Sequence, residues 1–149
     1  MNAIRLEYVV DASVGIKLFV DESDSAIAAA LFDQLVATPP ARFYVPDLFY
    51  IETASILWKY VRRFAFSITG AREALRALSA LDLASVSTSH LIGDALPIAV
   101  EHDVTAYDAC YVALADALDV TLVTADKRLA HALRDTQYRI VPLHRVGLP

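Results

Sequence analysis

The chain has 149 residues and a formal net charge of −5, and 56% of its residues are hydrophobic. This length suits one domain with a substantial core. No charge-free apolar run reaches the ~18 residues that a membrane-spanning helix needs, and the N-terminus lacks a signal-peptide layout, so a cytoplasmic location is expected. The negative charge excludes a protein that coats nucleic acid with a general basic surface. Apolar excess without a membrane segment predicts a dimer or a bound partner.

The first half of the chain alternates strand and helix patterns. The predicted elements are a strand over 8–12 (YVVDA) ending near Asp11, a short helix over 14–19, a helix over 25–37, a strand over 42–46 and a long helix over 47–64. Asp24 or Ser25 is expected to cap the third of these elements and Asp47 the last, because short polar side chains accept hydrogen bonds from free N–H groups at helix starts. Pro46 ends the second strand.

The second half continues in the same way. It predicts a helix over 69–82, a short strand within 83–89, a helical segment over 91–103, a helix over 105–119, a strand over 120–125, a helix over 127–135 and a strand over 138–143. Pro97 is expected to start, kink or break its segment.

The predicted fold class is α/β, with one domain over residues 1–149. Strands such as YVV and VTLV are continuous apolar runs, which indicates that both of their faces are covered. Alternating strands and helices favour a mainly parallel central sheet flanked by helices, an α/β/α sandwich, with right-handed crossovers.

Four acidic residues are expected at one edge of this sheet. Asp11 and Asp126 each follow a strand, Asp108 lies in the first turn of its helix, and Glu52 lies in the helix that leaves the sheet after Pro46. Ligands of open parallel sheets bind outside the carboxyl ends of the strands. We therefore expect the four carboxylates to gather there.

Each acid also has a purely structural interpretation. The three aspartates can be helix caps or partners of helix dipoles. Glu52 is less easily explained, because its helix is apolar nearly all round and is expected to be heavily buried. A buried glutamate without a partner or a ligated ion costs on the order of several kcal/mol in desolvation.

Gathered carboxylates suit a hard cation. Repulsion would protonate some of them unless divalent ions neutralise them, and oxygen-only ligands favour Mg²⁺ or Mn²⁺. Such a site would serve phosphodiester hydrolysis with one or two ions. Ser13 and Thr124 can orient the carboxylates or act as turn residues.

Four stretches in order, YVVDASV, an ETASIL-type helix after VPDL, TAYDACYVALA and LVTADKRL, resemble the PIN domain family. Within that family they look most like the VapC toxins of bacterial and archaeal toxin–antitoxin pairs. The resemblance runs from about residue 8 to residue 143 and so covers nearly the whole chain.

The resemblance implies an endoribonuclease that depends on Mg²⁺ or Mn²⁺ and acts on an RNA substrate. It carries the family's catalytic, metal-binding acids over to Asp11, Glu52, Asp108 and Asp126, and the hydroxyl beside them to Thr124. It further implies a homodimer and a cognate VapB-type antitoxin, whose tail reaches into the active-site groove.

Two other functions stay open at this point. One is a binding module that keeps the fold without nuclease activity. The other is an aspartate-based phosphotransfer domain. Phosphatases of this class have a second aspartate two residues after the first, and this chain has Ser13 at that position. Six cations could contact an RNA backbone. Lys127 and Arg128 are preferred because they adjoin Asp126, ahead of Lys17, Lys59, Arg62 and Arg63.

Overall fold

The structure, a computed structural model, describes residues 4–149; residues 1–3, the start of the predicted domain over 1–149, lie outside the described residues. The described residues form a five-stranded parallel sheet in the order β3-β2-β1-β4-β5. Its strands are β1 (Glu7–Val10), β2 (Arg42–Pro46), β3 (Leu83–Val86), β4 (Thr121–Thr124) and β5 (Ile140–Pro142). The predicted α/β class with a parallel sheet is confirmed.

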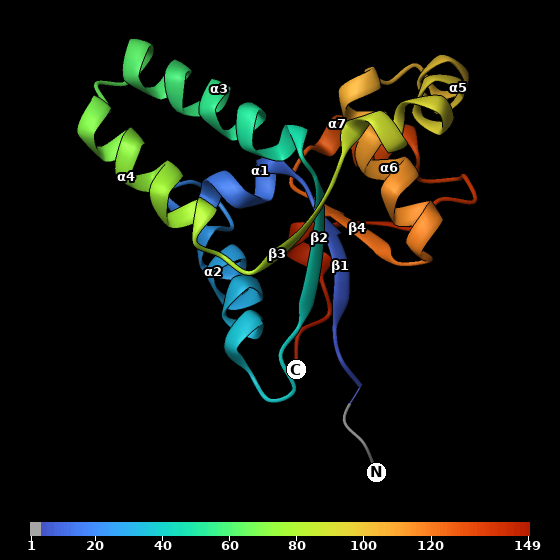
Figure 1. Ribbon diagram of the computed structural model, residues 1–149, viewed down its shortest axis with the longest axis horizontal. Helices are drawn as coiled ribbons and strands as arrows, with labels where there is room; N and C mark the ends of the chain where they lie inside the picture. Colours follow the sequence, from blue (N-terminus) through green and yellow to red (C-terminus); the bar gives the residue numbers. More distant parts are fainter. Residues whose placement is uncertain (1–3) are drawn as a thin grey trace.

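Helices cover both faces of the sheet. They are α1 (Ala12–Gly15), α2 (Ser25–Asp33), α3 (Leu48–Arg63), α4 (Ile68–Ser79), α5 (Ile92–His102), α6 (Ala106–Leu118) and α7 (Lys127–Ala132). Figure 1 shows α1 to α4 on one side of the strands and α5 and α6 on the other, while α7 packs against β4 and β5. Between residues 4 and 149, no helix combines the length and the apolarity needed to cross a membrane.

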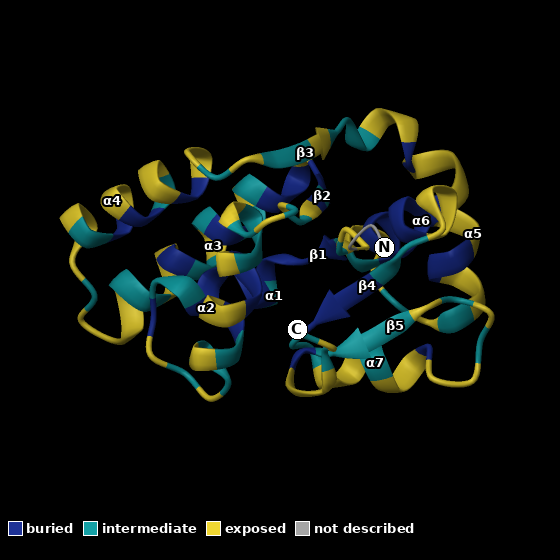
Figure 2. Cartoon of the chain, turned by 90° about the horizontal axis from the view of Figure 1, so that it is seen from below, coloured by how far each residue is buried: buried dark blue, intermediate teal, exposed yellow. Residues whose placement is uncertain are grey.

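Core side chains lie on both faces of the sheet, and α6 covers one of these faces. Residues 109–115 of α6 are all buried, and the helix packs across β1, β2 and β4. Val9 and Val123 have no exposed surface, as expected for strands covered on both faces. Figure 2 shows the same distribution, with buried residues on the central strands and on α6 and many exposed residues on α4.

The strand order reverses direction next to β1. The chain runs from β1 outward through β2 to β3, and then returns to add β4 and β5 on the other side of β1. Val10 pairs with Val123 in this register, so Asp11 and Thr124 follow at neighbouring strand ends. Such a switch point leaves a crevice at the carboxyl ends of the strands, where ligands bind in open α/β sheets.

Helices α3 and α4 project from the body of the molecule as an antiparallel arm (Figure 1). In α3, Leu48, Phe49, Thr53 and Leu57 are buried, whereas the side that carries Trp58 is exposed. The prediction that this helix is heavily buried all round is therefore wrong. Beyond its first turns α3 packs mainly on α4 and α1, and an apolar helix face can remain exposed where no element covers it.

Three local expectations also need correction. Pro97 lies inside α5, so the expectation that it starts or breaks its segment is wrong. Asp47 stands at the start of α3, but its carboxylate accepts no hydrogen bond from the N–H groups of that helix. It accepts two hydrogen bonds from Thr88 instead, one from the N–H at 2.9 Å and one from the hydroxyl. Lys17 is buried and its Nζ pairs with Glu22 at 3.2 Å, so the predicted RNA contact by Lys17 is wrong.

Candidate active site

Two of the predicted acids leave the ends of central strands and cap the helices that follow. Asp11 comes directly after β1, and its Oδ1 accepts a hydrogen bond from the Val14 N–H at 3.3 Å. Asp126 comes two residues after β4, and its Oδ1 accepts from the N–H groups of Arg128 (2.9 Å) and Leu129 (3.3 Å). The capping interpretation is correct for both residues, and it also holds both carboxylates at the switch point.

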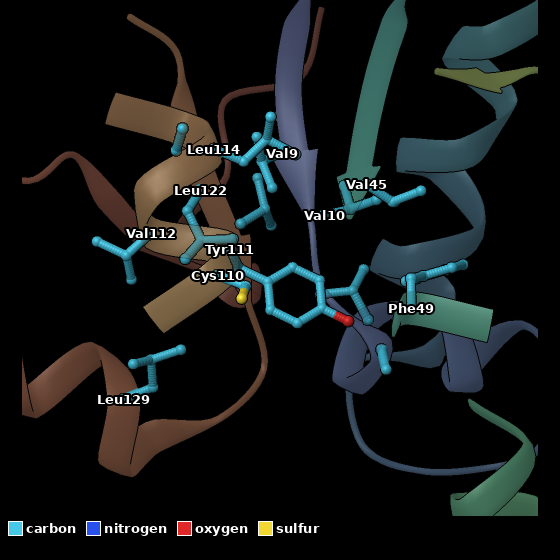
Figure 3. Packing of buried hydrophobic residues seen from close by; sticks show 14 of the residues in the cluster. Val9, Val10, Val45, Phe49, Cys110, Tyr111, Val112, Leu114, Leu122 and Leu129 are labelled. Atoms are coloured by element: carbon cyan, nitrogen blue, oxygen red, sulfur yellow. The ribbon is translucent and has the colours of Figure 1, made fainter. Parts of the chain in front are cut away.

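The other two acids come from helices on opposite sides of the sheet. Asp108 lies in the first turn of α6, which Thr105 caps by accepting a hydrogen bond from the Asp108 N–H at 3.1 Å. Glu52 lies on α3 and is half-buried rather than fully buried. Its Oε1 accepts a hydrogen bond of 2.6 Å from the Tyr111 hydroxyl. Figure 3 shows the Tyr111 ring reaching from α6 across the end of β1, with its hydroxyl turned toward the side that carries Phe49.

These four acids line one pocket of about 160 Å³. Its lining is Asp11, Ala12, Ser13, Glu52, Ile56, Asp108, Tyr111 and Asp126. Residues more than a hundred positions apart in the chain thus meet at the carboxyl edge of the sheet, as the sequence predicts. Of the residues that the structure describes, no lysine, arginine or histidine belongs to this lining.

A pair of hydroxyl groups ties Asp11 to the end of β4. The Ser13 hydroxyl donates to Asp11 Oδ1 and accepts from the Ala125 N–H at 2.9 Å. The fully buried Thr124 hydroxyl donates to Asp11 Oδ2 and accepts from the Asp126 N–H at 3.0 Å. Thr124 therefore connects two of the acids without lining the pocket itself.

The environment of the pocket disfavours negative charge. Burial raises the pKa of Asp11 to about 7, with a further rise from the charge of Asp108, against the hydrogen bonds from Ser13, Thr124 and Val14. Burial also raises the pKa of Glu52, helped by Asp108. The pKa of Asp108 is raised by burial and by the charge of Asp126. A pocket of this kind gains from a bound positive charge.

The donor set fits a hard divalent cation in its chemistry. All side-chain donors of the pocket are oxygens, the ligands that Mg²⁺ and Mn²⁺ prefer. As they stand, however, no three His, Cys, Asp or Glu side chains within residues 4–149 are grouped closely enough to hold a metal ion. Metal loading would therefore need the acids to draw closer together.

Tyr111 is a site residue that the sequence reasoning missed. It is almost completely buried, lines the acid pocket and bonds Glu52. A signal was present in the sequence, because Tyr111 follows Asp108 by three residues and positions i and i+3 share one face of a helix.

A second, larger hollow adjoins the acid pocket. It measures about 610 Å³ and lies between the end of α5, the start of α6 and α7. Asp108 and Asp126 line both spaces. Asp103 lines the larger hollow only, where it ends α5 in a left-handed conformation with φ of 54°.

Comparisons with known proteins point to one family. The model of the PIN domain family matches residues 8–134. The chain is 35% identical over 129 residues to ribonuclease VapC3 of Pyrobaculum aerophilum, covering 84% of this chain and 93% of that protein. Among solved structures, PAE2754 of P. aerophilum superposes with a TM-score of 0.65 at 26% identity, covering 93% of this chain and 85% of that one. A toxin–antitoxin complex of Klebsiella pneumoniae superposes with a TM-score of 0.63 at 16% identity, covering 93% and 99%.

Proposed function

Because the chain belongs to the PIN domain family, and to the VapC group within it, we propose that it is a Mg²⁺- or Mn²⁺-dependent endoribonuclease. The observation that carries the proposal is the convergence of Asp11, Glu52, Asp108 and Asp126 on one pocket at the switch point of the sheet. The relative that shares 35% identity is named a ribonuclease, which supports RNA as the substrate.

The four acids would hold the metal. Without a cation the pocket repels the phosphate of a substrate, since its lining within residues 4–149 carries carboxylates and no basic side chain. Bound Mg²⁺ or Mn²⁺ would attract the phosphate oxygens and acidify the attacking water. Both carboxylate oxygens of Asp11 already accept hydrogen bonds, from Ser13 and Thr124, which would hold this ligand in place.

The protein residues then have separate tasks. Thr124 and Ser13 keep both oxygens of Asp11 oriented. Tyr111 orients Glu52. Because burial raises the pKa of Asp11 to about 7, metal binding there would displace a proton, so both metal affinity and cleavage rate should rise with pH through neutrality.

We further propose that the protein is a toxin that forms a homodimer and is held by a VapB-type antitoxin. One structural neighbour is a toxin–antitoxin complex. Two exposed apolar surfaces support such associations. The first, on the arm, contains Ile51, Trp58, Phe64 and Ile68, and the second, on α5 and α6, contains Ile92, Leu96, Val100 and Tyr107.

The test of the nuclease is cleavage of a mixed pool of single-stranded RNA by the purified full chain. We expect cleavage with Mg²⁺ or Mn²⁺, none with EDTA, and none by Asp11→Asn. Asp33→Asn, which removes the same charge at an exposed position of α2, should cleave like the parent.

Undiminished cleavage by Asp11→Asn in EDTA would eliminate the proposed nuclease. Divalent-ion binding without RNA cleavage would instead favour a binding module, and phosphorylation by acetyl phosphate would favour a phosphotransfer domain. Light scattering on the purified chain measures whether it forms a dimer. The candidate antitoxin would be a small DNA-binding protein encoded by an open reading frame next to the gene of this chain.

A further inference from the structure

The acid pocket is too small to hold a nucleotide. Its volume is about 160 Å³, whereas sites that enclose small organic ligands measure roughly 300–1,000 Å³. Only the phosphodiester group and its cations can enter. The sugar and base on either side of that phosphate must therefore lie outside the acid pocket.

The adjoining hollow has the size that the acid pocket lacks. At about 610 Å³ it falls within the range of nucleotide-sized sites. It shares Asp108 and Asp126 with the acid pocket, so the two spaces meet at these side chains. A strand whose phosphate lies at the acids would have this hollow as the neighbouring space.

Basic residues are concentrated in two stretches of an otherwise acidic chain. Residues 59–76 contain five Lys and Arg against one acid, and residues 127–145 also contain five against one, which leaves three basic and sixteen acidic residues elsewhere. The first stretch covers the far part of the arm, and the second begins at α7, directly after Asp126, where its first residues line the hollow.

Within the second stretch, Lys127 and Arg128 are free to bind an anion. Both line the hollow and are exposed, and neither forms an ion pair within residues 4–149. Arg134 and Arg139, by contrast, are paired with Asp135 and Asp119. Lys127 and Arg128 also directly follow Asp126 in the chain, so these positive charges begin where the acid pocket ends.

We propose that the hollow between α6 and α7 binds the nucleotide next to the scissile phosphate, and that Lys127 and Arg128 pair with the backbone phosphate of that nucleotide. The inference rests on the proposed function and adds the path of the strand. The RNA runs over α7, and the basic residues of the arm are not needed for its first contacts.

The test measures RNA binding separately from cleavage. In an Asp11→Asn background, which should bind without cutting, a labelled single-stranded RNA is titrated by fluorescence anisotropy over a series of salt concentrations. The double variant Lys127→Ala/Arg128→Ala is compared with Arg62→Ala/Arg63→Ala, which removes the same charge from two exposed positions of the arm.

We expect the α7 double variant to bind about tenfold more weakly or worse. The slope of log Kd against log salt should fall by about 0.7 for each phosphate that the variant no longer pairs with. The arm variant should change both values much less. In the cleavage-competent chain, the α7 variant should raise KM for RNA with little change in kcat. If the double alanine variant melts at a lower temperature than the parent, Lys127→Gln/Arg128→Gln is used in its place. The same effects are expected of it.

Two results would overturn the inference: an unchanged Kd in the α7 variants, or an equal or greater weakening of binding in the arm variant. Both are distinct from failure of the proposed function, which would appear as absence of metal-dependent cleavage by the wild-type chain. If the wild type cleaves RNA and the α7 variants bind RNA normally, the nuclease proposal stands. The proposal that the hollow binds a nucleotide is then refuted.

Discussion

The Tyr111 hydroxyl donates a hydrogen bond of 2.6 Å to Glu52 Oε1, which joins α6 on one side of the sheet to α3 on the other (Figure 1). Tyr111 is 1% exposed, so its ring is held by packing. Within the part of the chain that the structure describes, Glu52 has no other side-chain hydrogen bond and no ion pair. The direction of the Glu52 carboxylate in the acid pocket therefore depends on Tyr111.

Tyr111→Phe should weaken metal binding. Removal of the hydroxyl frees the Glu52 carboxylate, and loss of a group that orients a metal ligand typically lowers affinity about 10–100-fold. We expect at least a tenfold decrease in Mn²⁺ affinity by calorimetry and a matching fall in kcat. Tyr107→Phe on the exposed side of the same helix is the control. If Tyr111→Phe melts at a lower temperature than the wild type but binds Mn²⁺ with unchanged affinity, then Tyr111 contributes to packing and does not orient Glu52.

The stability of the metal-free protein should fall as the pH rises from about 4 to about 7. The pKa of Asp11 is 3.8 in an unperturbed chain and about 7 in the fold, so between these values the folded state binds one proton more than the unfolded state. Stability falls with pH wherever the folded state binds more protons. The relevant measurement is thermal unfolding in EDTA between pH 5 and pH 8.

Asp11→Asn isolates this effect, because asparagine does not titrate. Each pH unit in that interval is worth about 1.4 kcal/mol, and part of this is offset because an amide cannot accept from both Ser13 and Thr124. We expect Asp11→Asn to melt about 5 °C above the wild type at pH 8, with a smaller difference at pH 5. Mn²⁺ should raise the melting temperature of the wild type only. Parallel pH curves for the two proteins would contradict the assignment to Asp11.

Thr124→Val should damage both stability and activity. Valine keeps the shape of threonine but removes the hydroxyl that donates to Asp11 and accepts from the Asp126 N–H. A polar group left unpaired in a buried position costs about 1–3 kcal/mol. Urea unfolding measures this decrease in stability, and Thr136→Val, at a partly buried position away from the pocket, is the comparison. Equal cleavage rates for Thr124→Val and wild type would show that Asp11 needs no such support.

Gly15→Ala tests the contact that brings α1 to α3, and hence Asp11 to Glu52. A Cβ at Gly15 would lie 2.8 Å from Phe49 Cζ, and Phe49 is fully buried, so its ring cannot move aside freely. Overpacking of this kind costs about 1–3 kcal/mol. Gly93→Ala in α5, where a Cβ meets nothing within 4 Å, should be neutral or slightly stabilising. A stable Gly15→Ala with normal cleavage would show that the α1–α3 contact can adjust.

The sequence by itself determined the order of strands and helices and the positions of the acids relative to them. Apolar β-branched runs and 3.6-residue periodicity act locally, and Asp11, Asp108 and Asp126 each stand next to a pattern that marks a strand end or a helix start. A parallel sheet then gathers its strand ends at one edge. The fold class and the meeting of the acids were predictable for that reason.

Only the tertiary structure decided which side chains are covered and which partners they meet. The exposed side of α3, the ion pair of Lys17 with Glu22 and the bond from Tyr111 to Glu52 all differ from expectation or were not foreseen. The size of the hollow beside α7 was equally beyond prediction. Burial and distance at these positions depend on how helices from separate parts of the chain pack against the sheet and against one another, and local sequence patterns carry no record of that packing.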